Sequence, residues 1–241
     1  MKRLAHAWLL AGLIFGGCVP VYIPNVRNAP LFGKRGEAQG SVWYGSSGVE
    51  AQGAVAVTDH FAVQANYSYG SQTDTAKDNK YNKHQLLEGG LGYFTNRKLF
   101  CYEVFLGYGQ GNGSSKAYNS VFWNARWESA SGKFTRLYLQ PSFGMNKGFF
   151  HWAFTPRVSM VNFYGFSNSI SANPAKVDLG PKLFLEPAAT VRFNGFHNRF
   201  FANIQMGLCV PWRGEQAFQY QIMSFSAGLG VRLGGIAKAE K

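Results

Sequence analysis

Apolar and polar residues alternate with a period of two along most of this chain. The clearest stretches are 136–145, 150–160 and 182–193, where an apolar residue occupies every second position. Charged, amide and hydroxyl side chains and glycine fill most of the positions between. Successive side chains of a β-strand point to opposite faces, so this pattern predicts strands with one apolar face.

The length of these stretches indicates what the apolar face contacts. Soluble strands average about five or six residues, whereas a tilted strand that crosses a bilayer needs about 9–11. The stretch 150–160 keeps its alternation over that longer distance. A bilayer also requires a closed sheet, because an open edge would leave peptide groups without partners. The pattern therefore predicts an all-β protein, a closed antiparallel transmembrane β-barrel with apolar residues outside and polar residues inside.

The predicted strands are joined alternately by short turns and long polar loops, as in outer-membrane barrels. The short turns lie at 58–60, 96–98, 146–148 and 194–198, and the long loops at 71–82, 110–131, 164–181 and 211–219. Ten strands are expected, at 37–45, 49–58, 60–70, 83–95, 98–109, 132–146, 149–163, 182–194, 199–210 and 220–233. The count becomes eight if the short first segment does not form a strand. It becomes twelve if 121–127 pairs inside the bilayer instead of extending a strand above it.

The N-terminus has the pattern of an export signal. A basic start, Met1-Lys2-Arg3, precedes the apolar stretch 4–15, which is too short to span a bilayer. The following Gly16-Gly17-Cys18 is similar to a bacterial lipobox, in which the cysteine is acylated and becomes the new N-terminus. The alternative is an ordinary signal peptide with an incidental cysteine. We expect a cleaved lipoprotein signal at 1–17, a lipidated extended tether at 18–36, a barrel at 37–234 and a basic periplasmic tail at 235–241.

Composition narrows the class of protein. The 241 residues carry a net charge of +12 and are 16% aromatic, which excludes a disordered chain. No helix-turn-helix or RNA-binding signature accompanies the positive charge, so nucleic acid is not an expected partner. Membrane lipids and lipopolysaccharide are the expected partners, with anionic phospholipid head groups meeting the basic turns and tail. The remaining cysteines, Cys101 and Cys209, lack the spacing of metal ligands, so no metal and no cofactor beyond the lipid on Cys18 is expected.

Charged residues at inward positions predict a lumen crossed by ion pairs. A barrel of eight to ten strands has little free interior, and buried charges must be paired. The alternation places these groups inside: Glu50, Glu88, Glu103, Arg136, Arg157, Lys182, Glu186, Arg192 and Arg232. A structural network is the favoured interpretation, and a narrow solute pore is the alternative. The tether either serves as a spacer at the periplasmic mouth or enters the lumen.

Catalysis at the extracellular rim is a second alternative. His84 with Asp78 and Asp74 could form a base and carboxylate pair in one loop, as a hydrolase of lipid A or peptide would need. No serine, histidine and aspartate converge on neighbouring predicted strands, so a non-catalytic protein is favoured. Aromatic residues of the long loops are instead candidates for contact with a protein partner, and the alternative is that they lie at the lipopolysaccharide boundary: Phe122, Trp123, Trp127, Tyr164 and Phe166.

Three short runs resemble the start of small lipoprotein outer-membrane β-barrels of Bacteroidota. They are Cys18-Val19-Pro20-Val21-Tyr22-Ile23-Pro24-Asn25, then Pro30-Leu31-Phe32 with Lys34-Arg35-Gly36-Glu37, and Ala56-Val57-Thr58-Asp59-His60. The resemblance implies a barrel in the outer membrane of a Gram-negative bacterium. In that phylum, surface export of lipoproteins goes with acidic residues directly after the cysteine. Val19-Pro20-Val21-Tyr22 has none, which implies a lipid in the periplasmic leaflet.

The resemblance also bears on function. It makes an accessory or structural subunit of a larger outer-membrane complex the leading hypothesis, with secretion or barrel-assembly machinery as plausible hosts.

Overall fold

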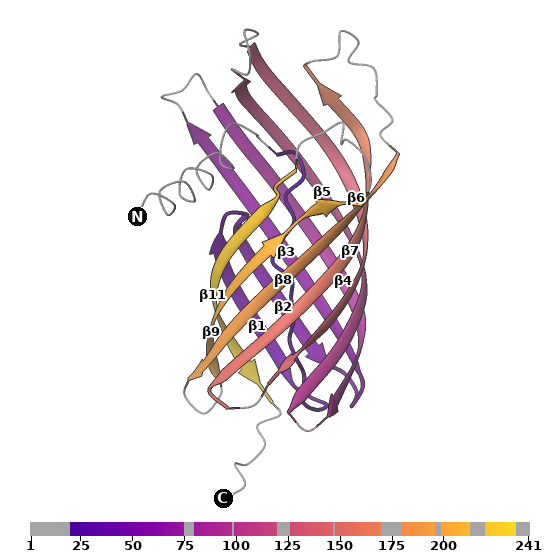
Figure 1. The fold of residues 1–241 in the computed structure, drawn as a ribbon, viewed down its shortest axis with the longest axis vertical. Helices are drawn as coiled ribbons and strands as arrows, with labels where there is room; N and C mark the ends of the chain where they lie inside the picture. Colours follow the sequence, from indigo (N-terminus) through magenta and orange to yellow (C-terminus); the bar gives the residue numbers. More distant parts are fainter. Residues whose placement is uncertain are drawn as a thin grey trace, which may run out of the picture.

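The chain forms one β-barrel (Figure 1). The computed structural model describes residues 20–74, 80–97, 99–119, 126–146, 148–169, 180–195, 199–212 and 220–234. The strands are β1 (Ala38–Gly45), β2 (Gly48–Ala56), β3 (Phe61–Asp74), β4 (Lys80–Arg97), β5 (Phe100–Asn119), β6 (Arg126–Met145), β7 (Phe150–Asn168), β8 (Pro181–Gly195), β9 (Phe200–Leu208), β10 (Val210–Pro211) and β11 (Met223–Leu233).

Ten strands close the wall, as the sequence predicted. Each strand from β1 to β8 pairs antiparallel with the next, β8 pairs with β9, and β11 pairs with both β9 and β1. The two-residue β10 continues β9, because Val210 opposite Leu185 keeps the register of Gly207 opposite Ala188. Closure gives every strand two neighbours, so the wall has no free edge.

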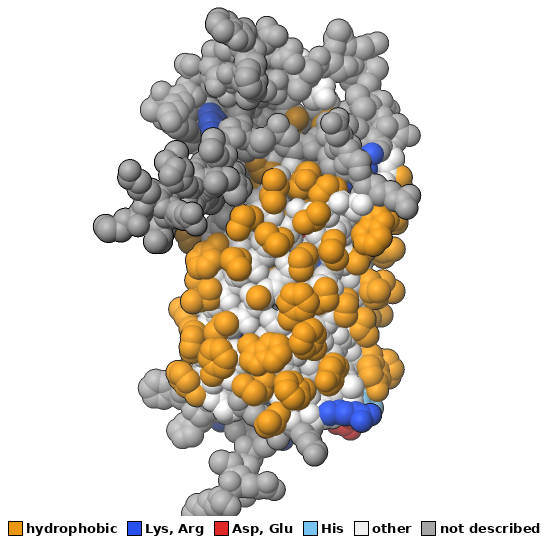
Figure 2. Space-filling model, in the orientation of Figure 1, with side chains coloured by type: hydrophobic (Ala, Val, Ile, Leu, Met, Phe, Trp, Pro, Cys, Tyr) orange, Lys and Arg blue, Asp and Glu red, His pale blue; other side chains and the backbone are white. Residues whose placement is uncertain are grey.

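The exterior of the wall is apolar, as a bilayer requires. Large side chains such as Tyr44, Leu91 and Leu229 are more than 70% exposed, at 74%, 72% and 71%. Figure 2 shows hydrophobic side chains, in orange, spread over the face of the barrel that is in view. Within the described ranges, no helix has both the length and the apolar character needed to cross a membrane.

The strands are joined differently at the two ends of the barrel. At the end that we call the short-turn end, strand pairs are joined across a few residues, as between Ala56 and Phe61. At the opposite end, the long-loop end, β5 and β6 stay paired as far as Asn119 opposite Arg126. These two strands run for 20 residues each, beyond the predicted 98–109 and 132–146. The extension includes Arg126 and Trp127, part of the stretch expected to lengthen a strand above the membrane.

Residues 20–32, which we call the luminal segment, lie inside the barrel. Every residue from Val21 to Phe32 is buried. At the long-loop end, the Pro20 carbonyl accepts a hydrogen bond from Asn82 Nδ2 (3.0 Å). At the short-turn end, Asn146 Nδ2 donates to the Leu31 carbonyl (2.9 Å). The described part of the tether therefore lies in the lumen, which it crosses from end to end before β1 begins.

Candidate functional site: the filled lumen

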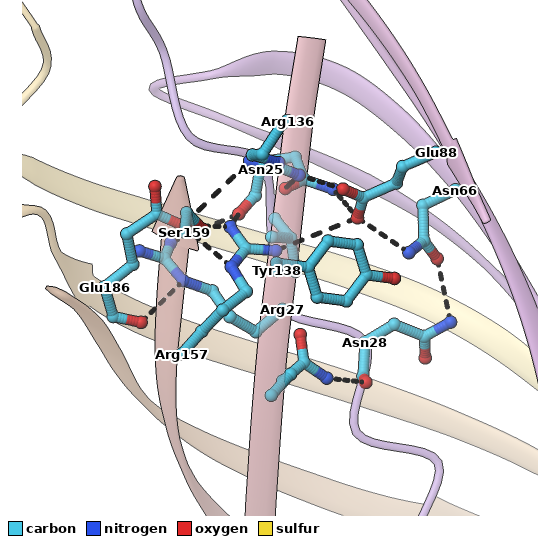
Figure 3. A network of polar contacts seen from close by, with 12 residues as sticks. Asn25, Arg27, Asn28, Asn66, Glu88, Arg136, Tyr138, Arg157, Ser159 and Glu186 are labelled. Atoms are coloured by element: carbon cyan, nitrogen blue, oxygen red, sulfur yellow. Dashed lines mark hydrogen bonds and ion pairs between the residues drawn. The ribbon is translucent and has the colours of Figure 1, made fainter. Parts of the chain in front are cut away.

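Four charged wall residues meet at the centre of the lumen (Figure 3). Glu88 on β4 and Glu186 on β8 both contact Arg136 on β6 and Arg157 on β7. Arg157 Nη2 lies 2.6 Å from Glu186 Oε2, and Arg136 forms an ion pair with Glu88. Two cations and two anions compensate one another, which is what burial of charge requires.

The luminal segment completes this network. The Tyr22 hydroxyl donates to Glu186 Oε1 (2.5 Å) and accepts from Arg136 Nη1 (3.1 Å). Asn25 donates from Nδ2 to Glu88 Oε1 (2.7 Å) and accepts at Oδ1 from Arg136 Nη2 (2.7 Å). The segment therefore belongs to the charged core and is not a loosely held occupant of it.

Arg27 adds a third buried cation, which carbonyl groups help to hold. Its Nη2 donates to the Leu208 carbonyl (2.9 Å), and its Nε donates to the Glu186 carbonyl (3.2 Å). The side chain is 1% exposed. Arg27 is one of the residues that sequence reasoning missed, because it lies in a segment with no strand periodicity.

Wall side chains also bind the backbone of the luminal segment. Gln205 Oε1 accepts from the Arg27 N–H (2.8 Å), and its Nε2 donates to the Arg27 carbonyl (2.9 Å). Gln52, Gln140 and Gln39 donate to the carbonyls of Val26, Asn28 and Pro30, at 2.8, 2.7 and 2.7 Å. The peptide groups of an extended segment have no partners of their own, so these amides supply what a neighbouring strand would supply.

Two predicted inward carboxylates bind peptide N–H groups of the luminal segment. Both oxygens of Glu50 accept from the Val26 N–H, at 3.0 and 2.8 Å, and Oε1 also accepts from the Ser47 hydroxyl. Glu103 Oε2 accepts from the Leu31 N–H (3.0 Å). The expectation that these groups pair with arginine or lysine is therefore not met, because the luminal segment brings its own donors to them.

The other predicted inward cations lie away from the central cluster. Arg192 Nε donates to Asn203 Oδ1 (2.9 Å), and the guanidinium stacks 4.2 Å from the centre of the Phe201 ring. Arg232 occupies an inward position of β11 near the short-turn end, and Lys182 a half-buried position near the start of β8. Among the described contacts, neither of these two forms an ion pair within 4.0 Å.

Glycine makes room for the luminal segment at its entrance. A Cβ atom at Gly113 of β5 would overlap the Val21 carbonyl oxygen. At Gly207 of β9, a Cβ would lie 2.8 Å from Arg27 Nη1. A larger residue at Gly113 would move the backbone of the segment, whereas at Gly207 it would displace the ends of the Arg27 and Ser224 side chains.

Glu37 holds the segment's exit at the short-turn end. Its Oε2 accepts from the Gly33 N–H (3.0 Å). Burial raises the pKa of this carboxyl, and the Gly33 hydrogen bond opposes that shift. The bond fixes the turn through which the chain enters β1.

The residues proposed for catalysis do not form a described site. His84 is buried at an inward position of β4, and its Nε2 contacts the Ser47 carbonyl (2.9 Å). Asp74 ends β3, and Asp78 lies outside the described residues. In the described parts of the chain, no group of three or more metal-binding side chains is placed to hold an ion.

Of the aromatic residues proposed for partner contact, two side chains are described. Tyr164 is 47% exposed on β7, whereas Phe166 is 2% exposed and packs against the Phe163 ring. Phe166 thus lies in the interior at the long-loop end instead of presenting a surface. Phe122 and Trp123 lie outside the described residues, as does the side chain of Trp127.

This chain resembles solved structures at low sequence identity. No protein-family model and no curated protein matches this sequence. The translocator domain of the autotransporter NalP from Neisseria meningitidis is 12% identical, with 96% of each chain covered and a TM-score of 0.49. OmpT, an outer membrane protein of Vibrio cholerae, is 8% identical over 82% of this chain and 96% of its own, with a TM-score of 0.21. Neither likeness bears on an activity.

Proposed function

We propose that this protein is an outer-membrane barrel, closed by its own luminal segment, that serves as a non-catalytic structural or accessory subunit of a larger outer-membrane complex. The observation that carries the proposal is the complete burial of Val21–Phe32 inside the wall. Side chains from strands all around the barrel hold this segment. Because the segment occupies the lumen, a structural role for the protein is favoured over a role as a solute pore.

The outer membrane fits the architecture. A closed antiparallel wall with short turns at one end, long loops at the other and an apolar exterior is the form that barrels take in that membrane. By the same rule, the short-turn end faces the periplasm and the long-loop end faces the cell exterior.

Lipidation of Cys18 is part of the proposal. The support is Gly16-Gly17-Cys18 after a short apolar stretch. Cys18 itself lies outside the described residues. Two acyl chains on this residue would anchor the protein stably where one would be marginal.

Copurification tests the accessory role. Tagged protein, extracted from native membranes in a mild detergent, should carry a stoichiometric protein partner that mass spectrometry identifies. Tyr164→Ala should weaken this association, since Tyr164 is exposed at the long-loop end, whereas Tyr93→Ala near the short-turn end should not. A barrel that purifies alone, and whose loss leaves every outer-membrane complex intact, would refute the accessory role.

A further inference from the structure

The rim of the barrel is low at one place on the long-loop end. The hairpin of β1 and β2 turns between Gly45 and Gly48, and β2 ends its pairing with β3 at Val49 opposite Tyr69. β3 continues five residues further, to Asp74 opposite Lys80. Figure 1 shows this hairpin, in indigo, ending well below the tips of β3 to β7. We call this gap in the rim the notch.

The turn between β1 and β2 forms the floor of the notch and is fixed by its neighbours. The Ser46 N–H donates to the Phe225 carbonyl (3.0 Å), and the Ser46 hydroxyl accepts from the Phe225 N–H (3.0 Å). Gly48 has a φ of 84°, and a Cβ there would overlap the Tyr69 carbonyl. The turn is therefore held low by hydrogen bonds and by a glycine that its neighbours require.

A cavity of about 530 Å³ lies at the notch, and its lining combines residues of the luminal segment, polar residues such as Asn82 and Gln221, and exposed residues of the outer wall. On its inner side it is lined by Pro20 and by Ile23, which is buried. On its outer side it is lined by apolar residues that face the bilayer: Tyr44, Val49, Tyr69, Ile222 and Met223. The described chain thus begins inside a groove that leads to the lipid.

The cavity lies within reach of Cys18. Cys18 precedes Pro20 by two residues, which span about 7 Å at most. Because Pro20 itself lines the cavity, Cys18 lies within about 7 Å of the cavity wall.

We propose that the acyl chains on Cys18 leave the barrel through the notch and enter the outer leaflet against Tyr44, Val49 and Ile222. The protein would then carry its lipid at the cell surface, the opposite of the periplasmic leaflet expected from the absence of acidic residues after Cys18. This inference rests on the lipidation proposed above, but not on the accessory role.

Photo-crosslinking of the full-length protein in cells fed an alkyne-bearing fatty acid tests the inference. A photo-reactive amino acid replaces Val49 in the notch or, as the matched control, Val63. Val63 also faces the bilayer but lies on β3 near the short-turn end. After irradiation, mass spectrometry should find the position-49 peptide shifted by the mass of the acylated N-terminal peptide, and the position-63 peptide unshifted.

Three results would overturn the proposal. They are the shifted product at position 63 instead of 49, a position-49 adduct that contains lipopolysaccharide instead of the N-terminal peptide, and an N-terminal peptide that carries no fatty acid. The copurification experiment is independent of all three, so a misplaced lipid and a failed accessory role can be told apart.

Discussion

At the scale of single residues, the filled lumen depends on hydrogen bonds that join the luminal segment to charged wall residues. The Tyr22 hydroxyl is the clearest case, since it links Glu186 to Arg136. Burial removes water as an alternative partner for either charge. A small change at such a position should therefore have a large effect.

Tyr22→Phe should lower the free energy of unfolding by about 1–3 kcal/mol, because it leaves a buried carboxylate oxygen and a guanidinium N–H without this partner. Tyr67→Phe is the control, since Tyr67 faces the bilayer and is 43% exposed. The test is denaturant unfolding in detergent micelles, followed by the mobility shift of the folded barrel. Equal stability of the two variants would show that the hydroxyl of Tyr22 does not support the network.

Gly113→Ala should lower the unfolding temperature, because its Cβ would push against the Val21 carbonyl. Gly53→Ala is a matched control in another strand, where a Cβ would meet no atom within 4 Å. Thermal unfolding in the same detergent compares the two. If the unfolding temperature falls equally in both variants, the effect comes from replacing a strand glycine in general and not from contact with Val21.

The residue scale also shows how far the site could be predicted. Alternation correctly places Glu88, Arg136, Arg157 and Glu186 inside, because side-chain direction in a strand is a local property. It could not reveal that Glu50 binds peptide groups of another segment. The available signal was a set of amides at inward positions, whose donors and acceptors can pair with the peptide groups of an extended segment: Gln39, Gln52, Gln140 and Gln205.

At the scale of elements, the strands were predictable where a bilayer imposes the apolar face. The long-loop ends of β3 to β7 were not, because above the membrane the outward residues no longer need to be apolar. Residues 20–32 contain three prolines and no strand periodicity, so local rules indicated only an extended tether. Their burial depends on partners more than a hundred positions away, such as Gln205.

The luminal segment should keep the barrel closed to ions. Tyr22 and Arg27 are among its largest fully buried side chains. The unmodified protein should show no stepwise conductance in planar bilayers, and a Tyr22→Ala, Arg27→Ala double variant should show it, because it opens space beside the charged core. Lys34→Ala is the control, since Lys34 is exposed outside the lumen. Conductance of the unmodified protein equal to that of the double variant would contradict a closed lumen.

At the scale of the whole molecule, the direction of the luminal segment places the two ends of the tether on opposite sides of the membrane. Pro20 lies at the long-loop end, and Lys34 lies just beyond the short-turn end of the segment. A membrane-impermeant maleimide should therefore label Pro20→Cys in intact cells and Lys34→Cys only after lysis. The reverse labelling would show that the barrel is inserted with its long loops toward the periplasm.

The central claim is that residues 20–32 occupy the lumen, and disulfide trapping tests it most directly. Asn28 Nδ2 lies 2.8 Å from Asn66 Oδ1 on β3, while the next residue, Tyr67, faces outward. In a background with Cys101→Ala and Cys209→Ala, mild oxidation of the folded protein should join Asn28→Cys to Asn66→Cys, but not to Tyr67→Cys. The bond would be read as a non-reducing gel shift. Failure of the 28–66 pair to form, with Asn28→Cys instead open to water-soluble thiol reagents, would contradict a luminal segment inside the barrel.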